Sequence, residues 1–126
     1  LYSSDIAFTP AVKAIQAAKG SRQAYARMEE AGSWSTEISK ELAEYIARQR
    51  SFFLATANRI GQPYIQHRGG PPGFLRVIDA QTLGFADYRG NKQYISLGNL
   101  VENKNVHLFL IDYEEQSRVK IWGEAL

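Results

Sequence analysis

The sequence predicts a mainly β fold, a small antiparallel β-barrel with helices, preceded by a helical N-terminal arm. The first fifty residues repeat their apolar side chains at spacings of three and four, as helices do. From Ser51 onward, six short runs rich in β-branched and aromatic residues alternate with turns at close intervals, which is typical of a small barrel. We therefore expect a helical arm over residues 1–50 and a barrel domain over residues 51–126.

Three helices are expected in the arm. The first begins at Thr9-Pro10, where a capping side chain precedes a proline, and it ends at Gly20. A second helix is outlined by Ala24, Tyr25, Met28 and Gly32. A third, which Ser39 could cap, has an apolar stripe of Ile38, Leu42, Tyr45 and Ile46. We assign this segment a packing role, because no residue in it forms a chemical motif.

The strands of the barrel are expected in pairs. Gly61 supplies the positive φ that the first hairpin turn requires, and Asp79-Ala80-Gln81 forms the second turn. Helical spacing returns once, over residues 94–101, where Ser96 and Asn99 are expected at the surface or as caps. The expected strands are residues 51–57, 62–67, 74–78, 82–86, 106–113 and 119–122.

Composition excludes several classes of protein. Fifteen Lys and Arg against thirteen Asp and Glu leave a net charge of only +2, and the basic residues are scattered, so nucleic-acid binding is not expected. No apolar run approaches the roughly 18–20 residues of a membrane span, and no secretory signal is visible. The absence of cysteine rules out thiolate chemistry and agrees with a cytoplasmic location. Two histidines forty residues apart predict no metal site.

The first candidate site is the stretch from Gln66 to Phe74. Three glycines and two prolines follow Arg68 within five positions, so a rigid, irregular corner is expected after the second strand. Glycine lets a ligand approach the backbone, and the neighbouring guanidinium, imidazole and amide offer donors and acceptors to a flat, polar-edged ligand. A β-bulge or wide turn with solvated polar side chains is the alternative.

The second candidate site is the segment from Asp87 to Gln93. Arg89, Asn91 and Lys92 gather donors just before the expected helix, whose first backbone N–H groups can hold a phosphate. The alternative is a polar turn capped by Asn91. Elsewhere, His107 is expected to be packed or solvated, Trp34 and Trp122 to be core aromatics, and Asp112, Glu114 and Glu115 to form a solvated turn.

From about Phe52 to Ala125 the chain resembles the FMN-binding split-barrel proteins of the pyridoxamine 5′-phosphate oxidase type. The resemblance rests on the order of several short motifs: Leu54-Ala55-Thr56-Ala57, Gly61-Gln62-Pro63-Tyr64, Thr82 to Tyr88, Gly90-Asn91-Lys92, Leu97 to Leu100 and Val119 to Ala125. The run from Gln66 to Phe74 is similar to a subgroup known as flavin-nucleotide-binding proteins, which also has a helical N-terminal arm. The resemblance further implies that the barrel continues beyond Leu126.

The resemblance implies a homodimer with FMN between the subunits. It assigns phosphate or ribityl contacts to Asn91, Lys92 and Gln93, and a phosphate or pyrimidine-edge contact to Arg68. It places Gln66, His67, Gly69 and Gly70 along the isoalloxazine, and Trp122 facing the ring. The true oxidase carries an Arg-x-Val-Leu-Leu-Lys run and a Ser-Arg-Lys triplet where this chain has Gln66 to Gly70 and Gly90-Asn91-Lys92, so pyridoxamine phosphate is not the expected substrate.

The resulting interpretation is an FMN-dependent oxidoreductase that acts on a small-molecule redox substrate, with no identifiable general acid or base. The substrate and the electron donor stay open, as does deazaflavin in place of FMN. One alternative is a flavin carrier or sensor without turnover. Another is a haem-binding split barrel that uses His67 or His107 as an axial ligand. Nucleic-acid binding through a basic barrel face is the least favoured.

Overall fold

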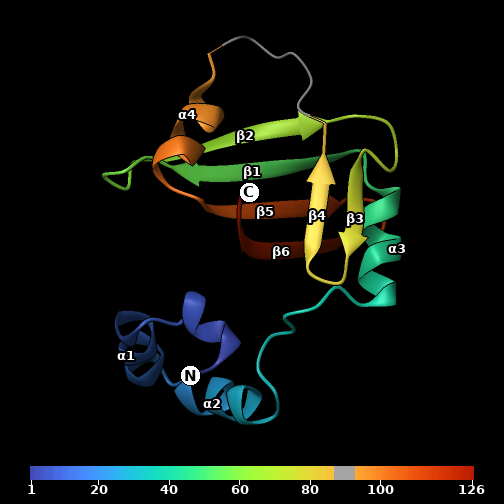
Figure 1. The fold of residues 1–126 in the computed structure, drawn as a ribbon. Helices are drawn as coiled ribbons and strands as arrows, with labels where there is room; N and C mark the ends of the chain where they lie inside the picture. The colour runs from blue at the N-terminus through green and yellow to red at the C-terminus, as the bar shows by residue number, and fades with distance from the viewer. Residues whose placement is uncertain (87–92) are drawn as a thin grey trace. The chain divides into compact units, whose positions relative to one another are not determined.

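The computed structural model describes residues 1–86 and 93–126, which form two compact units, Leu1–Ile38 and Ser39–Leu126 (Figure 1). The third expected helix thus belongs to the same unit as the strands. The division into domains at residue 50 remains a prediction. None of the helices in the described ranges is long and apolar enough to cross a membrane.

The N-terminal unit contains a short 3-10 helix η1 (Ser3–Ile6), α1 (Pro10–Lys19) and α2 (Arg22–Glu30). Thr9 caps α1 as predicted: its Oγ1 accepts a hydrogen bond from the Val12 N–H at 3.3 Å. Gly20 ends the helix with a φ of 92°, a left-handed conformation that glycine adopts without strain. The Phe8 ring meets the edges of Tyr25 and Trp34 at centroid distances of 5.1 and 5.2 Å.

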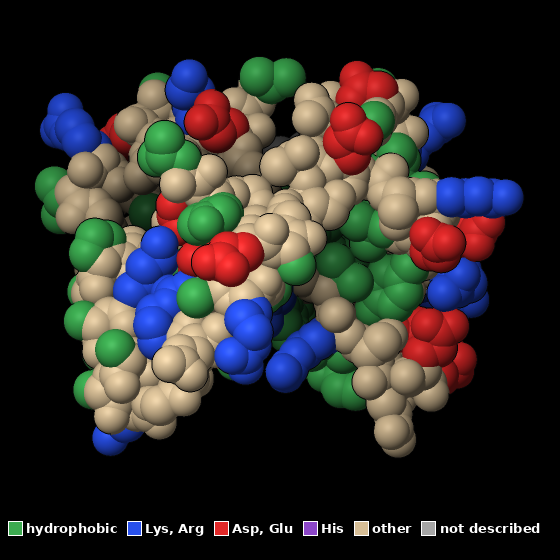
Figure 2. Space-filling view, turned by 90° about the horizontal axis from the view of Figure 1, so that it is seen from below, with side chains coloured by type: hydrophobic (Ala, Val, Ile, Leu, Met, Phe, Trp, Pro, Cys, Tyr) green, Lys and Arg blue, Asp and Glu red, His purple; other side chains and the backbone are tan. Residues whose placement is uncertain are grey.

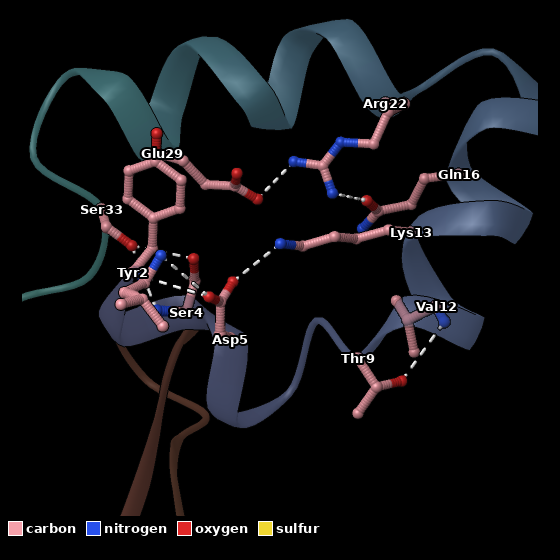
Figure 3. Close-up of polar contacts among 11 residues, drawn as sticks. Tyr2, Ser4, Asp5, Thr9, Val12, Lys13, Gln16, Arg22, Glu29 and Ser33 are labelled. Carbon is pink, nitrogen blue, oxygen red and sulfur yellow. Dashed lines mark hydrogen bonds and ion pairs between the residues drawn. The ribbon is translucent and has the colours of Figure 1, made fainter.

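The residues buried most deeply in the N-terminal unit are polar. Ser4, Gln16 and Glu29 expose 9% of their surface or less. Arg22 donates to both the Gln16 amide oxygen, at 2.7 Å, and the Glu29 carboxylate (Figure 3). A second ion pair joins Lys13 to Asp5 at 2.9 Å, and this hydrogen bond lowers the pKa of Asp5 to about 2. Polar contacts therefore hold the two helices and η1 together.

The C-terminal unit begins with α3 (Lys40–Arg48), capped as predicted by the Ser39 hydroxyl, which accepts from the Leu42 N–H at 3.1 Å. Four strands form one antiparallel sheet in the order β2-β1-β5-β6, and β3 pairs with β4 in a separate hairpin that runs across the sheet direction (Figure 1). The strands are β1 (Ser51–Ala57), β2 (Pro63–Gly69), β3 (Leu75–Asp79), β4 (Thr82–Phe85), β5 (Asn105–Asp112) and β6 (Ser117–Glu124), with α4 (Ile95–Glu102) between β4 and β5.

Strand alternation divides the four-stranded sheet into two faces. We call the side of Phe52, Leu54 and Thr56 the inner face; these residues are buried. The Phe52 ring lies 5.6 Å from Phe74 and 5.1 Å from Phe85, so the hairpin packs on this face. We call the opposite side the outer face; there Ser51, Phe53, Ala55 and Ala57 of the same central strand are only half-buried. The hydrophobic core lies on the inner side alone.

The expected strands and the late helix are all present, with ends that differ by a few residues. The most consequential difference is at β2, which continues to Gly69 instead of ending at His67. Glycines at positions 69 and 70 made an earlier end more plausible, but pairing of Gly69 with Ser51 extends the strand. On the surface, Figure 2 shows acidic and basic side chains interspersed on the face it presents, with apolar side chains between them.

Candidate functional site

The strand β2 forms one edge of the sheet, with β1 as its neighbour. Its burial alternates, half-buried at Gln66 and Arg68 and exposed at His67 and Gly69. Gln66 and Arg68 pair with the buried Leu54 and Phe52, so their side chains lie on the inner face. The residues predicted together from sequence therefore lie on both faces of the sheet. Gln66 and Arg68 lie on the inner face, and His67 and Gly69 lie on the outer face.

A polar cluster occupies the inner side of β2. The Gln66 Oε1 atom accepts a hydrogen bond from Ser96 Oγ at 2.8 Å and another from Arg68 Nη2 at 3.1 Å. The Arg68 guanidinium also lies 5.7 Å from the centroid of the Phe85 ring, a cation–π distance. We call Gln66, Arg68 and Ser96 the inner cluster. It combines a permanent cation, a hydroxyl and an amide beside an aromatic ring.

Helix α4 joins this cluster to the sheet through polar contacts. Ser96 is 3% exposed and Asn99 is 9% exposed, and Asn99 Nδ2 donates to Thr56 Oγ1 at 2.9 Å. The expectation that Ser96 and Asn99 lie at the surface is therefore wrong. Their spacing of three residues places both on the face of the helix that contacts β1 and β2. The three-residue spacing indicates from sequence that Ser96 and Asn99 share a helix face. It does not indicate that this face is buried, because polar residues ordinarily lie on the solvent side of a helix.

The beginning of α4 lies beside the second candidate segment. Tyr94 precedes the helix with a φ of 59°, and its side chain makes no capping hydrogen bond. The first backbone N–H groups of any α-helix lack partners within the helix and carry a partial positive charge. Gln93 is exposed next to this helix end. The predicted contacts Asn91 and Lys92 lie outside the described residues.

The glycines after β2 have different structural roles. A Cβ atom on Gly70 would come within 2.8 Å of the Phe74 ring, so the close packing of Phe74 requires a glycine at this position. The Gly70 N–H also donates to the Arg50 carbonyl at 2.9 Å. At Gly69, a Cβ would meet His67 at 3.4 Å, which is ordinary contact. Gly70 thus has a packing explanation, whereas Gly69 leaves the exposed side of the edge strand without a side chain.

The remaining predicted residues lie on the outer face. The His67 ring meets the edge of Phe53 at 5.3 Å, and the His107 ring meets Trp122 at 4.6 Å. Burial lowers the pKa of His107, and the nearby Lys120 charge lowers it further, so both effects favour the neutral imidazole. Trp122 is half-buried on the outer face rather than in the core where it was expected.

Trp122 and the predicted β2 residues lie at opposite edges of the sheet. Strand order places β6 three strands away from β2, a separation of about 14 Å at the usual spacing of 4.7–4.9 Å between strands (Figure 1). One chain therefore brings together Gln66 and Arg68 at the start of α4, and His67 with Gly69 on the other side of the same strand. It does not bring Trp122 to either group.

Comparison with known proteins identifies the fold and the family. The profile of the family described as pyridoxamine 5′-phosphate oxidase matches residues 38–126. No curated protein matches. A crystal structure of a tagged histidine-to-alanine variant of HupZ from Group A Streptococcus is similar with a TM-score of 0.54, at 18% sequence identity over 69% of this chain and 67% of that chain.

The predicted fold, a mainly β split barrel with helices, is confirmed by these two matches. Members of the matched family usually bind a flavin and are typically dimeric. The profile covers 89 of 126 residues, which is well over half of the sequence. The chain belongs to the pyridoxamine 5′-phosphate oxidase-like family of FMN-binding split-barrel proteins.

Proposed function

We propose that this protein binds FMN non-covalently as a homodimer and uses it as an oxidoreductase on a small-molecule redox substrate. The observation that carries the proposal is the inner cluster. Arg68, Gln66 and Ser96 meet on an edge strand, beside the first turn of α4. Arg68 provides a positive charge for a phosphate group, and the edge strand β2 provides backbone groups for a planar ring. A mononucleotide has both a phosphate and a ring to bind.

The donor set fits a phosphate group. A guanidinium forms charge-assisted hydrogen bonds to phosphate oxygens, and a hydroxyl and helix N–H groups add neutral ones. Arg68 supplies the guanidinium from β2, and the first backbone N–H groups of α4 supply neutral donors, whereas the Ser96 hydroxyl donates to Gln66. The resemblance adds Asn91, Lys92 and Gln93 from the segment that leads into α4. These residues would hold the phosphate and the ribityl chain.

The edge position of β2 fits the flavin ring. An edge strand presents backbone N–H and C=O groups in alternation, and the pyrimidine end of isoalloxazine has acceptors and a donor in a similar order. Gly69 leaves that edge open on the outer side, and His67 flanks it. Because Trp122 of the same chain is three strands away, a ring contact from Trp122 requires a second subunit.

When bound, the flavin supplies two-electron chemistry by accepting or donating a hydride. The residues of this chain bind and orient it: Arg68 neutralises phosphate charge, and Gln66 and His67 lie beside the strand that would carry the ring. No side chain of this set is assigned as a general acid or base.

The phosphate assignment is tested by comparing FMN with riboflavin, which lacks the phosphate. We expect Arg68→Ala to weaken FMN binding by about 1.5–3 kcal/mol, the range for hydrogen bonds to charged groups, and to leave riboflavin binding nearly unchanged. Arg76→Ala, at an exposed arginine of β3, is the matched control. We expect Lys92→Ala to cost about 1–3 kcal/mol as well. Equal loss of both ligands in Arg68→Ala would contradict the assignment.

Turnover is tested on the protein as purified. We expect yellow absorbance that bleaches on adding NADH or another reduced donor. Bleaching with dithionite but with no biological donor would favour the alternative, a flavin carrier or sensor. A Soret band in place of flavin absorbance would favour haem, for which the half-buried His107, whose pKa is lowered by burial, is a suitable ligand.

A further inference from the structure

The hydrogen-bond acceptor of the inner cluster is already used within the protein. Gln66 Oε1 accepts from both Ser96 Oγ, at 2.8 Å, and Arg68 Nη2, at 3.1 Å. An amide oxygen has two lone pairs, so these two donors saturate it. Ser96 is 3% exposed, whereas Gln66 and Arg68 are half-buried and can be reached from solvent. The two accessible side chains of the cluster therefore offer a ligand donors alone.

The same two contacts fix the direction in which the Gln66 side-chain amide points. The oxygen and nitrogen of an amide can exchange places by rotation about the last side-chain bond. A guanidinium has no acceptor, so the Gln66 atom that faces Arg68 must be the oxygen. Within residues 1–86 and 93–126, no protein group accepts a hydrogen bond from the Gln66 amide nitrogen. This NH2 group is therefore left for a ligand.

The position of Arg68 assigns the Gln66 amide to the phosphate end of the proposed site. Arg68 donates to Gln66, and its guanidinium lies 5.7 Å from the centroid of the Phe85 ring. A ligand group bound by Arg68 therefore lies next to the Gln66 amide as well. The resemblance to known flavoproteins instead implies an isoalloxazine contact for Gln66. Phosphate fits the donors better, because it carries a charge of about −1.5 to −2 at pH 7 and three acceptor oxygens.

The hydroxyl of Ser96 can hold the amide while a ligand is bound. An incoming phosphate competes with Gln66 for the hydrogens of the Arg68 guanidinium. The buried Ser96 hydroxyl is out of reach of that phosphate and keeps its hydrogen bond to Gln66. Ser96 belongs to the first turn of α4, whereas Gln66 and Arg68 belong to β2. The amide is thus held from a second element of the fold, independently of Arg68.

We propose that Ser96 is a positioning residue that acts through Gln66: it holds the Gln66 oxygen so that only the amide NH2 group faces the ligand. The site thereby selects a ligand group that accepts hydrogen bonds and donates none. A phosphate dianion is such a group, and a hydroxyl is not. This inference rests on the proposed function and adds the residue that sets the preference for FMN over riboflavin.

A purely structural role of Ser96 makes a different prediction. Ser96 and Asn99 both connect α4 to the sheet, Ser96 to Gln66 of β2 and Asn99 to Thr56 of β1 at 2.9 Å. If Ser96 only fastened the helix, loss of either contact would weaken the binding of all ligands alike. Thr56→Val removes the hydroxyl that accepts from Asn99 and changes the side-chain shape little. It is therefore the matched control for Ser96→Ala.

The proposal is tested on the full chain by the affinities for FMN and riboflavin, together with the unfolding temperature. We expect Ser96→Ala to lower the ratio of the FMN affinity to the riboflavin affinity at least fivefold. Thr56→Val should lower the unfolding temperature and leave that ratio within twofold of the unmodified protein. Equal weakening of both ligands by Ser96→Ala, or an equally large change of the ratio in Thr56→Val, would overturn the proposal.

Action through Gln66 is tested by a double-variant cycle on the same ratio. Gln66→Ala should lower the ratio at least fivefold. Adding Ser96→Ala to Gln66→Ala should then change the ratio less than twofold, because the oxygen that Ser96 holds is gone. A further fivefold loss in the double variant would show that Ser96 acts by another route, and the proposal would be rejected.

Failure of the proposed function can be distinguished from failure of this inference. If the unmodified protein binds neither FMN nor riboflavin, the proposed function is rejected, and inorganic phosphate becomes the probe of Ser96. Phosphate should raise the unfolding temperature of the unmodified protein and of Thr56→Val clearly more than that of Ser96→Ala. An equal rise in Ser96→Ala, or no rise in the unmodified protein, would overturn the role of Ser96.

Discussion

The two compact units of this chain bury different kinds of side chain. In the C-terminal unit, the most deeply buried residues are apolar: Ile46, Phe52, Leu75 and Leu110 expose 1% or less. In the N-terminal unit, the buried residues are Ser4, Gln16 and Glu29, while Ile6 and Ile15 are more than half exposed. Apolar burial is non-directional, whereas buried polar groups stabilise only if every partner is present. The C-terminal unit should therefore tolerate changes of pH and salt that weaken the N-terminal unit.

Each unit has its own tryptophan, Trp34 in the N-terminal unit and Trp122 in the C-terminal unit, and the chain has only these two. Trp122→Phe and Trp34→Phe backgrounds thus report on the N-terminal and C-terminal units separately by fluorescence. Urea unfolding in the two backgrounds measures the free energy of unfolding of each unit. All the following variants are compared in this way.

The largest effect is expected for Phe52→Ala. This ring is 1% exposed and contacts Phe74 and Phe85, so its removal leaves a cavity and should cost the C-terminal unit about 3–5 kcal/mol. Phe53→Ala, at the adjacent half-buried position on the outer face, should cost a monomer clearly less. Similar losses in a monomeric background would show that the outer face is as well packed as the inner one.

The next largest effect is expected for Arg22→Met. It leaves the Glu29 carboxylate, 5% exposed, without its ion-pair partner. Breaking a buried pair costs about 3–5 kcal/mol, and we expect about 2–3 kcal/mol because the Arg22 side chain is itself 20% exposed. Combining it with Glu29→Leu should restore much of the loss in the N-terminal unit. A double variant no more stable than Arg22→Met would show that the carboxylate has other partners.

Helix caps should contribute equally to the two units. Thr9→Ala removes the cap of α1 and Ser39→Ala removes the cap of α3. Each should cost about 1 kcal/mol, because the lost hydrogen bond is local and partly exposed in both cases. Unequal costs would indicate that one of the caps also supports contacts beyond its own helix.

The smallest effects are expected from pH. The lowered pKa of Asp5 stabilises the N-terminal unit above the ordinary value of 3.8, and this contribution is lost as the pH falls toward 2. His107 also has a lowered pKa, so the unfolded chain binds its proton first, and the C-terminal unit loses stability as the pH falls below 6.5. Unfolding curves between pH 7 and pH 2 for Asp5→Asn and His107→Gln check both, since each variant should flatten its own pH dependence.

Local features of this chain could be predicted from sequence, and long-range ones could not. Caps at Thr9 and Ser39 and the strand 51–57 depend on neighbouring residues, and all three are observed. The burial of Ser96 and Asn99 depends on partners 30 and 43 residues away, Gln66 and Thr56, which no periodicity reveals. Trp122 was placed with the β2 residues by resemblance, but the strand order that separates them is a property of the whole sheet.

The seven residues of β2 face alternate sides of an edge strand. Gln66 and Arg68 are half-buried on one side, and Ile65 and His67 are exposed on the other. One short segment therefore presents two separate surfaces, and substitutions at even-numbered positions change one of them without changing the other.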